Sequence, residues 1–421
     1  MEDRPKGAPT PLVTAWAEPQ RPVNWVFIAS ITLANIGIMI VLLAPLNNLL
    51  PRYAELIAGD QGKVGALAWV SGVGAIAAMV FNPVAGAFSD RTTLRLGRRR
   101  PWIIGGALAG GALMVVMSYQ TSIVWLTVLW FLVLAASNSA YSAATAYTPD
   151  QVPVSQRGVI SGFVGLAAVV GAVLGVALDS YVVTDLRLGT WLLGGLMVVM
   201  VLPLLIWVPD SQLPREVVPP FELKQFLRNF WVSPRLYPDF AWAFITRCLI
   251  WFGTALTIMY LLYYLTDFLH YPQPEQGQTV LVLVYGVGTV LTAVIAGRLS
   301  DRSGRRKIYV TVSSIVMGLS VLILAFIPTF GAACVGALLL GLGYGVYLAV
   351  DQALITQVLP AASDRARDLG VINIANTAPQ ILAPMAAAPI VTYLGYPSLF
   401  LTTTIVMVIA GILVRFIRSV P

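Results

Sequence analysis

An acidic and a basic side chain lie inside two long apolar stretches of this sequence. Asp351 belongs to the stretch at 331–357, and Arg247 belongs to the stretch at 239–267. Each lies roughly eight residues from one end, about 12 Å deep if the stretch is helical. Charged groups are costly in apolar surroundings, so they mark functional positions. We expect Asp351 to bind and release a proton, with its charge state set by burial and by Arg247. The alternative is a static ion pair that locks two helices together.

Polar and aromatic side chains also recur at helical spacing in four apolar stretches. The members of each set are three to seven residues apart, so they share one helix face. The sets are Asn138, Tyr141 and Thr145; Arg247, Trp251 and Thr254; Tyr344, Tyr347 and Asp351; and Asn373, Asn376 and Gln380. Such faces either bind a small polar molecule or join and pack helices, and the spacing alone leaves both readings open.

The sequence lacks the residue sets that are typical of enzymes. No nucleophile with a base and an orienting group, no metal-binding motif and no phosphate-binding loop is present. Cys248 and Cys334 lie in apolar stretches without metal-ligand spacing, and His270 lies in a polar segment. We therefore expect no enzymatic activity, no cofactor and no metal site.

The composition indicates which elements hold these residues. The chain is 58% hydrophobic and 11% charged, with a mean hydropathy of +0.81, far from the range of soluble globular proteins. A helix that spans a bilayer needs about 20 mainly apolar residues. Twelve such stretches occur, at 23–50, 63–88, 102–118, 123–147, 158–180, 189–208, 239–267, 277–297, 308–327, 331–357, 369–394 and 396–417. We therefore expect an all-α membrane protein with twelve transmembrane helices.

The basic residues predict how these helices are oriented. All 26 Lys and Arg residues except Arg52, Lys63, Arg187 and Arg247 fall on segments that are cytoplasmic if the N-terminus is cytoplasmic. We therefore expect both termini in the cytoplasm and the helices in the plasma or inner membrane. The basic residues behind the net charge of +7 then lie beside anionic membrane lipids. We therefore expect these residues to contact lipids and expect no nucleic acid as a partner.

Two charged segments of similar amino-acid sequence follow the ends of the second and the eighth apolar stretch. They are GAFSDRTTLRLGRRRP at 86–101 and GRLSDRSGRRK at 297–307, and their first glycines are 211 residues apart, half the chain. This repeat predicts two pseudo-repeated six-helix bundles around a central cavity. The expected organisation is a disordered cytoplasmic tail at 1–22, a first bundle at 23–208, a cytoplasmic linker at 209–238 and a second bundle at 239–421.

The pattern of a glycine, three residues, Asp-Arg and then Gly-Arg-Arg resembles the signature loop of the major facilitator superfamily. The second copy has the usual spacing, whereas TTLRL separates Arg91 from Gly97 in the first. That longer form, SDRTTLRLGRRRPW, resembles the sucrose-transporter-like and glycoside-pentoside-hexuronide symporter branch. GLGYGVYLAVDQALITQVLP and DLGVINIANTAPQILAP resemble bacterial members of the sucrose-carrier-like group. The resemblance implies a secondary transporter with alternating access, which we expect to be a monomer because each chain encloses its own pathway.

The resemblance places both charged loops at the cytoplasmic ends of the two bundles. A carrier that alternates between two closed ends needs contacts there that hold and then break. The residues expected to form this cytoplasmic gate are Gly86, Asp90, Arg91, Gly97, Arg98, Gly297, Asp301, Arg302, Gly304 and Arg305. The glycines would allow close packing, and the charged groups would pair with each other or with helix ends. The alternative is that the basic residues only set topology.

The resemblance also implies that the polar helix faces line a central cavity. Sugars offer hydroxyls to amide and guanidinium groups and apolar ring faces to Trp and Tyr. The expected substrate-binding residues are Asn138, Tyr141, Trp251, Tyr344, Tyr347, Asn373, Asn376 and Gln380, and the expected proton-coupling pair is Asp351 with Arg247.

The chain departs from its relatives at the positions used for ion coupling. Plant-type sucrose carriers have an acid and an arginine on helix 4 where this chain has Leu134 and Thr145, and the stretch at 63–88 lacks the acid with which melibiose-type relatives bind sodium. We therefore expect proton-coupled symport of a sugar or glycoside. The alternatives are a proton-driven exporter of amphipathic drugs or glycosylated products, and a membrane sensor or scaffold that transports nothing.

Overall fold

The computed structural model describes residues 20–183, 185–210, 212, 235–303, 305–358 and 365–418. Every regular element in these residues is a helix. The elements in chain order are α2 (Trp25–Ala44), η1 (Pro45–Leu49), α3 (Leu50–Ser89), α4 (Arg100–Met117), α5 (Ile123–Gln151), α6 (Val154–Ala177), η2 (Leu178–Val182), α7 (Leu186–Trp207), α9 (Pro238–Met259), α10 (Leu261–Tyr263), η4 (Tyr264–Phe268), α11 (Pro274–Ser303), α12 (Arg306–Phe326), α13 (Phe330–Val358), α14 (Arg365–Leu413) and η6 (Val414–Phe416). Most of the predicted tail and most of the predicted linker lie outside the described residues.

Two helical stretches are too long for a single crossing of a membrane. Trp25–Ser89 has 65 residues and Ile374–Phe416 has 43, whereas one crossing needs about 20. Each contains one non-helical glycine, Gly59 in α3 with a φ of 71° and Gly395 in α14 with a φ of 78°. Glycine has no Cβ and adopts this conformation without strain. Ten described stretches are long and apolar enough to cross, and with two crossings in each of these two they agree with the twelve predicted helices.

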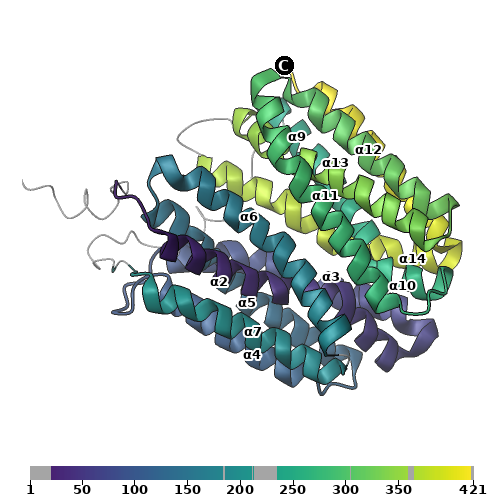
Figure 1. Cartoon of the computed structure of the whole chain (residues 1–421), viewed down its shortest axis with the longest axis horizontal. Coiled ribbons are helices and arrows are strands. Elements are labelled where there is room, and N and C mark those ends of the chain that lie inside the picture. The colour runs from purple at the N-terminus through teal and green to yellow at the C-terminus, as the bar shows by residue number, and fades with distance from the viewer. Residues whose placement is uncertain are drawn as a thin grey trace, which may run out of the picture.

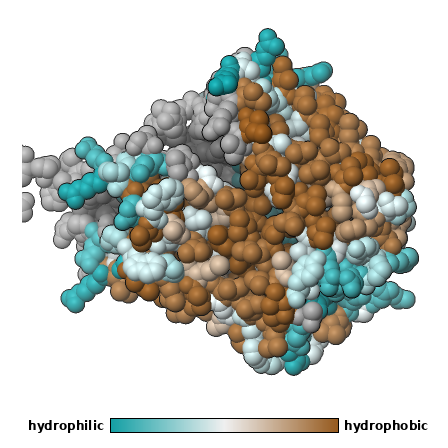
Figure 2. Space-filling view, in the orientation of Figure 1, coloured by the Kyte–Doolittle hydropathy of each residue, from teal (hydrophilic) through white to brown (hydrophobic). Residues whose placement is uncertain are grey.

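Apolar side chains cover the outside of the bundle. Ile295, Leu319 and Leu382 are each more than half exposed. Figure 2 shows hydrophobic residues over the middle of the visible face, with hydrophilic residues gathered toward its ends. Such a surface is unfavourable in water but suits lipid, where each helix satisfies its own backbone hydrogen bonds. The chain is thus an integral membrane protein.

The helices pack in two groups that share one internal pattern. In the first half, α2 to α7, helices α3 and α4 contact α5, α2 contacts α6, and α4 contacts α7. In the second half, α9 to α14, helices α11 and α12 contact α13, α9 contacts α14, and α12 contacts α14. Figure 1 shows the first half in purple to teal beside the second in green to yellow. The repeated packing is what the duplicated charged loops predict.

The most extensive contacts between the halves are those of α3 with α14 and of α6 with α11. The helices approach closely at glycines, because a Cβ added to Gly72 would lie 3.4 Å from α14 and one added to Gly286 would lie 2.9 Å from α6. We call the end of the bundle that holds residues 90–100 the arginine end. The opposite end, which holds Lys63, is called the lysine end.

Candidate functional site

The structure brings Arg247 and Asp351 together. Arg247 lies in α9 and Asp351 in α13, and Arg247 Nη1 donates a hydrogen bond to Asp351 Oδ2. Arg247 Nε donates to Asn376 Oδ1 of α14 over 2.5 Å. The Arg247 and Asp351 side chains are only 7% and 5% exposed. One buried guanidinium therefore joins three helices of the second half. The sequence predicted that Arg247 lies near Asp351 but not that it contacts Asn376.

The helical period of α9 explains why Arg247 points inward. Its buried positions include Ala243, Arg247, Ile250 and Thr254, which recur every three or four residues. The Thr254 hydroxyl donates to the Ile250 carbonyl over 2.8 Å. The inner face of α9 is therefore apolar or internally satisfied next to the arginine, and Arg247 reaches across to Asp351 and Asn376 on neighbouring helices.

Four aromatic rings form a cluster beside the ion pair. The Trp251 and Tyr344 rings meet edge to face with centroids 6.1 Å apart, and Tyr344 lies 5.7 Å from Tyr285 and 6.2 Å from Tyr347. Tyr344 and Tyr347 precede Asp351 by two turns and one turn of α13. The buried Trp251 Nε1 has no hydrogen-bond partner among the described residues. Tyr285 was not predicted, because it belongs to none of the polar helix faces.

Other predicted binding residues do not join this cluster. Asn138 lies in α5 of the first half, and its Nδ2 donates to a carbonyl of its own helix over 2.9 Å. Tyr141, on the same helix, packs against the apolar core. Gln380 Nε2 likewise donates to a carbonyl of its own helix, over 3.1 Å. The surroundings of the Asn373 side chain lie outside the described part of the structure.

The first charged loop forms an ion cluster inside the first half. Arg99 pairs with Asp90 at 2.5 Å and with Asp150 at 2.8 Å, and Arg98 pairs with Asp150 at 2.5 Å. Burial acts to lower the pKa of Arg99, but Asp150 and Asp90 raise that pKa above its ordinary value, so the guanidinium stays charged. Arg91 Nη1 donates to a carbonyl of its own helix. These contacts fasten α3 and α4 to α5, within one half.

Asp210, which the sequence did not single out, holds the start of α4. Its Oδ2 accepts hydrogen bonds from the backbone nitrogens of Arg99 over 2.7 Å and of Arg100 over 2.9 Å. A carboxylate at a helix N-terminus satisfies free N–H groups and is attracted by the helix dipole. Asp210 follows α7, so this contact joins the end of α7 to the start of α4 at the arginine end.

Two of the predicted gate glycines have local roles in the first half. Gly97 has a φ of 100°, and a Cβ there would lie 2.3 Å from Asp210 Oδ2. A Cβ on Gly86 would lie 2.9 Å from the Ser142 hydroxyl oxygen in α5. Both glycines thus permit close contacts inside the first half.

Gly97→Ala should destabilise the folded protein by about 1 to 3 kcal/mol, because alanine at positive φ is strained and its methyl group displaces Asp210. Thermal unfolding of the purified protein in detergent measures the effect. Gly105→Ala is the matched control, since a Cβ at Gly105, in α4, meets nothing within 4 Å. The control should unfold at the wild-type temperature or above it. Equal unfolding temperatures for Gly97→Ala and wild type would contradict the local role of Gly97.

The second charged loop is built differently from the first. Helix α11 continues through Arg302 to Ser303, so the Asp-Arg pair of this copy is helical. Arg302 and Arg305 are exposed. The predicted gate residue Gly304 lies outside the described residues. Gly297 and Asp301 belong to α11, but their surroundings lie outside the described part of the structure.

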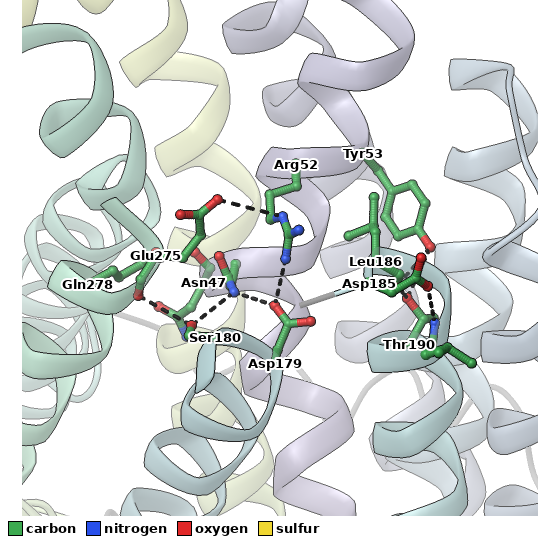
Figure 3. A network of polar contacts seen from close by, with 12 residues as sticks. Asn47, Arg52, Tyr53, Asp179, Ser180, Asp185, Leu186, Thr190, Glu275 and Gln278 are labelled. Atoms are coloured by element: carbon green, nitrogen blue, oxygen red, sulfur yellow. Dashed lines mark hydrogen bonds and ion pairs between the residues drawn. The ribbon is translucent and has the colours of Figure 1, made fainter. Parts of the chain in front are cut away.

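A polar network lies at the lysine end, and the sequence reasoning did not single out its acidic members, Asp179 and Glu275 (Figure 3). Arg52 lies 3.3 Å from Asp179 through Nη1 and 3.9 Å from Glu275 through Nε. Asn48 Nδ2 donates to Asp179 Oδ2, and Gln278 Nε2 donates to a carbonyl of η1 over 2.6 Å. Glu275 and Gln278 belong to α11, whereas the other members belong to the first half. The network therefore fastens the two halves together.

The fold thus has two helical halves, and the buried ion pair lies inside the second half. The family model of the Major Facilitator Superfamily matches residues 26–280 and 244–421. The chain belongs to the major facilitator superfamily of transporters.

Solved structures of other transporters share the fold. The nucleoside transporter NupG superposes with a TM-score of 0.74 at 13% identity, over 93% of this chain and 99% of that chain. The human organic anion transporter MFSD10 (TETRAN) superposes with a TM-score of 0.70 at 16% identity, over 94% of this chain and 100% of that chain. At these identities the similarity concerns the fold alone.

Parts of the chain are similar to plant sucrose transport proteins. It is 31% identical over 135 residues to the sucrose transport protein SUC4 of Arabidopsis thaliana, which covers 27% of this chain and 26% of that protein. It is 39% identical over 61 residues to the sucrose transport protein SUT5 of Oryza sativa subsp. indica, which covers 14% of this chain and 11% of that protein. The chain thus spans about a quarter or less of the length of these curated relatives.

Proposed function

We propose that this chain carries a sugar or glycoside together with protons across the cell membrane by alternating access. The observation that carries the proposal is the buried contact of Arg247 with Asp351 and Asn376, beside the Trp251 and Tyr344 rings. In this proposal the Asp351 carboxylate binds the proton, and its basic partner Arg247 binds a hydroxyl of the substrate. The two ligands therefore meet at one ion pair.

The ion pair supports coupling because its two members depend on each other. While Asp351 accepts from Arg247, its negative charge is compensated and proton binding is disfavoured. A substrate hydroxyl that engages the guanidinium weakens this compensation, and the buried carboxylate then takes up a proton. Proton uptake in turn releases Arg247 to bind the substrate. Each ligand therefore favours binding of the other, as symport requires.

The aromatic cluster supports a ring-shaped polar substrate. The apolar face of a sugar ring packs on Trp or Tyr, while its hydroxyls need donors and acceptors. Trp251 Nε1 is such a donor, and Asn376 adds an amide from α14. In this proposal Asn138 and Tyr141 line the opposite wall, and Asn373 and Gln380 line α14. The local similarity to sucrose transport proteins is a second support.

The basic residues support the orientation that we propose. Arg98 and Arg99 lie at the arginine end, before the start of α4. Because successive crossings alternate in direction, exposed Arg302, Arg305 and Arg418, at the end of α11, before α12 and after η6, belong to the same end of the bundle. Cytoplasmic segments carry an excess of such residues, which also attract anionic lipids. We place the arginine end and both termini in the cytoplasm, with bundles at 23–208 and 239–421 joined by the linker, and we propose that the monomer is the working unit.

Proton movement in proteoliposomes tests this function. The purified chain is reconstituted without an imposed gradient, and external pH is recorded while mono- and disaccharides and aryl glycosides are added one at a time. A symporter should take protons up with its substrate, so the external solution becomes alkaline with the substrate alone. Empty vesicles and vesicles that contain Asp351→Asn are the controls.

The same measurement separates the alternatives. Proton release from the vesicles on addition of amphipathic drugs, with no response to the sugar panel, would assign the exporter. Saturable sugar uptake without proton movement would support a sugar as the substrate and would contradict coupling to protons. A chain that moves neither class under any gradient would support the sensor or scaffold.

A further inference from the structure

A buried lysine lies where the two halves meet at the lysine end. The Lys63 side chain in α3 is 3% exposed. Its ammonium lies 2.7 Å from Asp267 of η4, 2.7 Å from Asp60 and 3.4 Å from Glu55. It also lies 5.0 Å from the centre of the Tyr263 ring, within the range of a cation–π contact. Neither the proposed substrate site nor the cytoplasmic charged loops use this cluster.

The partners of Lys63 are divided between the halves. Asp267 belongs to the second half, whereas Asp60 and Glu55 belong to the first half, like Lys63 itself. Asp267 has its own alternative partner, because its Oδ2 accepts from the Tyr396 hydroxyl of α14 over 2.9 Å. Among the described carboxylates around Lys63, only Asp267 lies in the second half. The Tyr263 ring of α10 is an uncharged partner of Lys63 in that half.

This division changes what it costs to separate the halves. Breaking a buried ion pair is expensive chiefly because it leaves one charge without compensation. If Lys63 leaves Asp267, the lysine keeps two carboxylates and Asp267 keeps the Tyr396 hydroxyl. An ammonium on a flexible stem can change partners in this way more readily than a planar guanidinium. A cavity of about 430 Å³ bordered by Asp60, Lys63 and Asp267 provides room for the exchange.

We propose that Lys63 is a two-position latch that controls opening of the lysine end. In the closed position it bonds Asp267 and holds α3 against the second half. In the open position it remains with Asp60 and Glu55 in the first half. The proposal rests on alternating access but not on the substrate or on proton coupling.

The other contacts at this end are consistent with such a latch. The Tyr263 hydroxyl donates to the Pro51 carbonyl over 2.9 Å, and the Thr279 hydroxyl bonds the Ser180 hydroxyl over 3.0 Å. These ties are neutral and exchange readily with water when the end opens. A second charged contact at this end, between Arg52 and Glu275, is longer at 3.9 Å. The Lys63–Asp267 pair is shorter at 2.7 Å and more buried, so its loss should have the largest effect on opening.

The test compares two carboxylates that lie at the same distance from Lys63. Asp267→Asn removes the contact between halves, whereas Asp60→Asn removes a contact inside the first half. Spin labels are placed at the exposed positions Thr121 and Pro328, in lysine-end turns of the two halves, after Cys248 and Cys334 are replaced by alanine. Double electron–electron resonance in lipid nanodiscs, without substrate or gradient, then measures the open and closed populations.

Asp267→Asn should raise the ratio of open to closed molecules by about tenfold, within the usual range of coupling between two states. Asp60→Asn should leave the ratio within about twofold of wild type or shift it toward the closed state, because the open position loses a partner. Equal opening by both variants would overturn the latch, since it would mean that any loss of charge loosens the cluster. No opening in Asp267→Asn would overturn it as well.

A second variant keeps the test decisive if Asp267→Asn is poorly produced. Lys63→Met removes the same contact from the other side, together with the contact with the Tyr263 ring, and keeps the apolar stem, so it should open the lysine end at least as far. The double variant should open no further than Lys63→Met, because the two variants share the loss of the Lys63–Asp267 contact. Additive opening would overturn the proposal. Since distances are read without transport, a chain that moves no sugar can still show the latch.

Discussion

Asp351→Asn should abolish uptake driven by a pH gradient while it preserves exchange of labelled substrate across the membrane. Asparagine has nearly the same shape and still accepts from Arg247, but it binds no proton at physiological pH. The substrate can therefore bind and cross in both directions, whereas the proton step is missing. Both rates are measured in the same proteoliposomes, with uptake expected at the level of empty vesicles and exchange well above it.

The matched control for this change is Asp185→Asn. Asp185 is exposed at the N-terminus of α7, where its Oδ1 accepts from two backbone nitrogens over 3.0 and 2.8 Å. Asparagine caps helices as well as aspartate does, so this variant should keep both uptake and exchange. Full pH-driven uptake by Asp351→Asn would remove Asp351 from the coupling mechanism.

Arg247→Met should cost about 3 to 5 kcal/mol of stability, because it leaves Asp351 buried without its counter-charge. Asn376 also loses a donor over 2.5 Å. We expect little folded protein in membranes and a lower unfolding temperature for whatever is purified. Adding Asp351→Asn should restore folded protein, because the double variant buries no unpaired charge.

Transport by the double variant decides between the two roles of the ion pair. If Asp351 carries the proton, the double variant folds but shows no pH-driven uptake. If the pair is a static lock between α9 and α13, the double variant recovers uptake along with folding. Recovery of pH-driven uptake would therefore contradict the coupling that we propose, even with Asp351→Asn alone inactive.

The helices were predictable because the bilayer imposes a simple rule on sequence. Each crossing requires about 20 apolar residues, and the predicted stretches lie close to the observed helices. The predicted and observed helix ends differ where the composition does not change at the end of the helix. The first crossing continues beyond the predicted end at residue 50 to the break at Gly59, because the polar residues near Arg52 satisfy one another at the lysine end.

The candidate site was predictable only in part. Arg247 and Asp351 were found because a charge in an apolar stretch is conspicuous. Tyr285 was missed because a tyrosine in an apolar helix has the same sequence signature whether it faces a cavity, lipid or another helix. Asp210 and Lys63 were missed because their partners are distant in sequence, 110 or more residues away in α4 and 204 away in η4. Tertiary packing decides such pairings.

The described halves have diverged in what they do with their charges. The first half places Arg99, Asp90, Asp150 and Asp210 in contacts that tie its own helices together. The second half holds the ion pair and the aromatic rings. In the function that we propose, the first half thus supplies rigidity and the second half supplies most of the substrate contacts. Changes in what such a carrier transports should then accumulate mainly within residues 238–413, without disturbing the architecture of the first half.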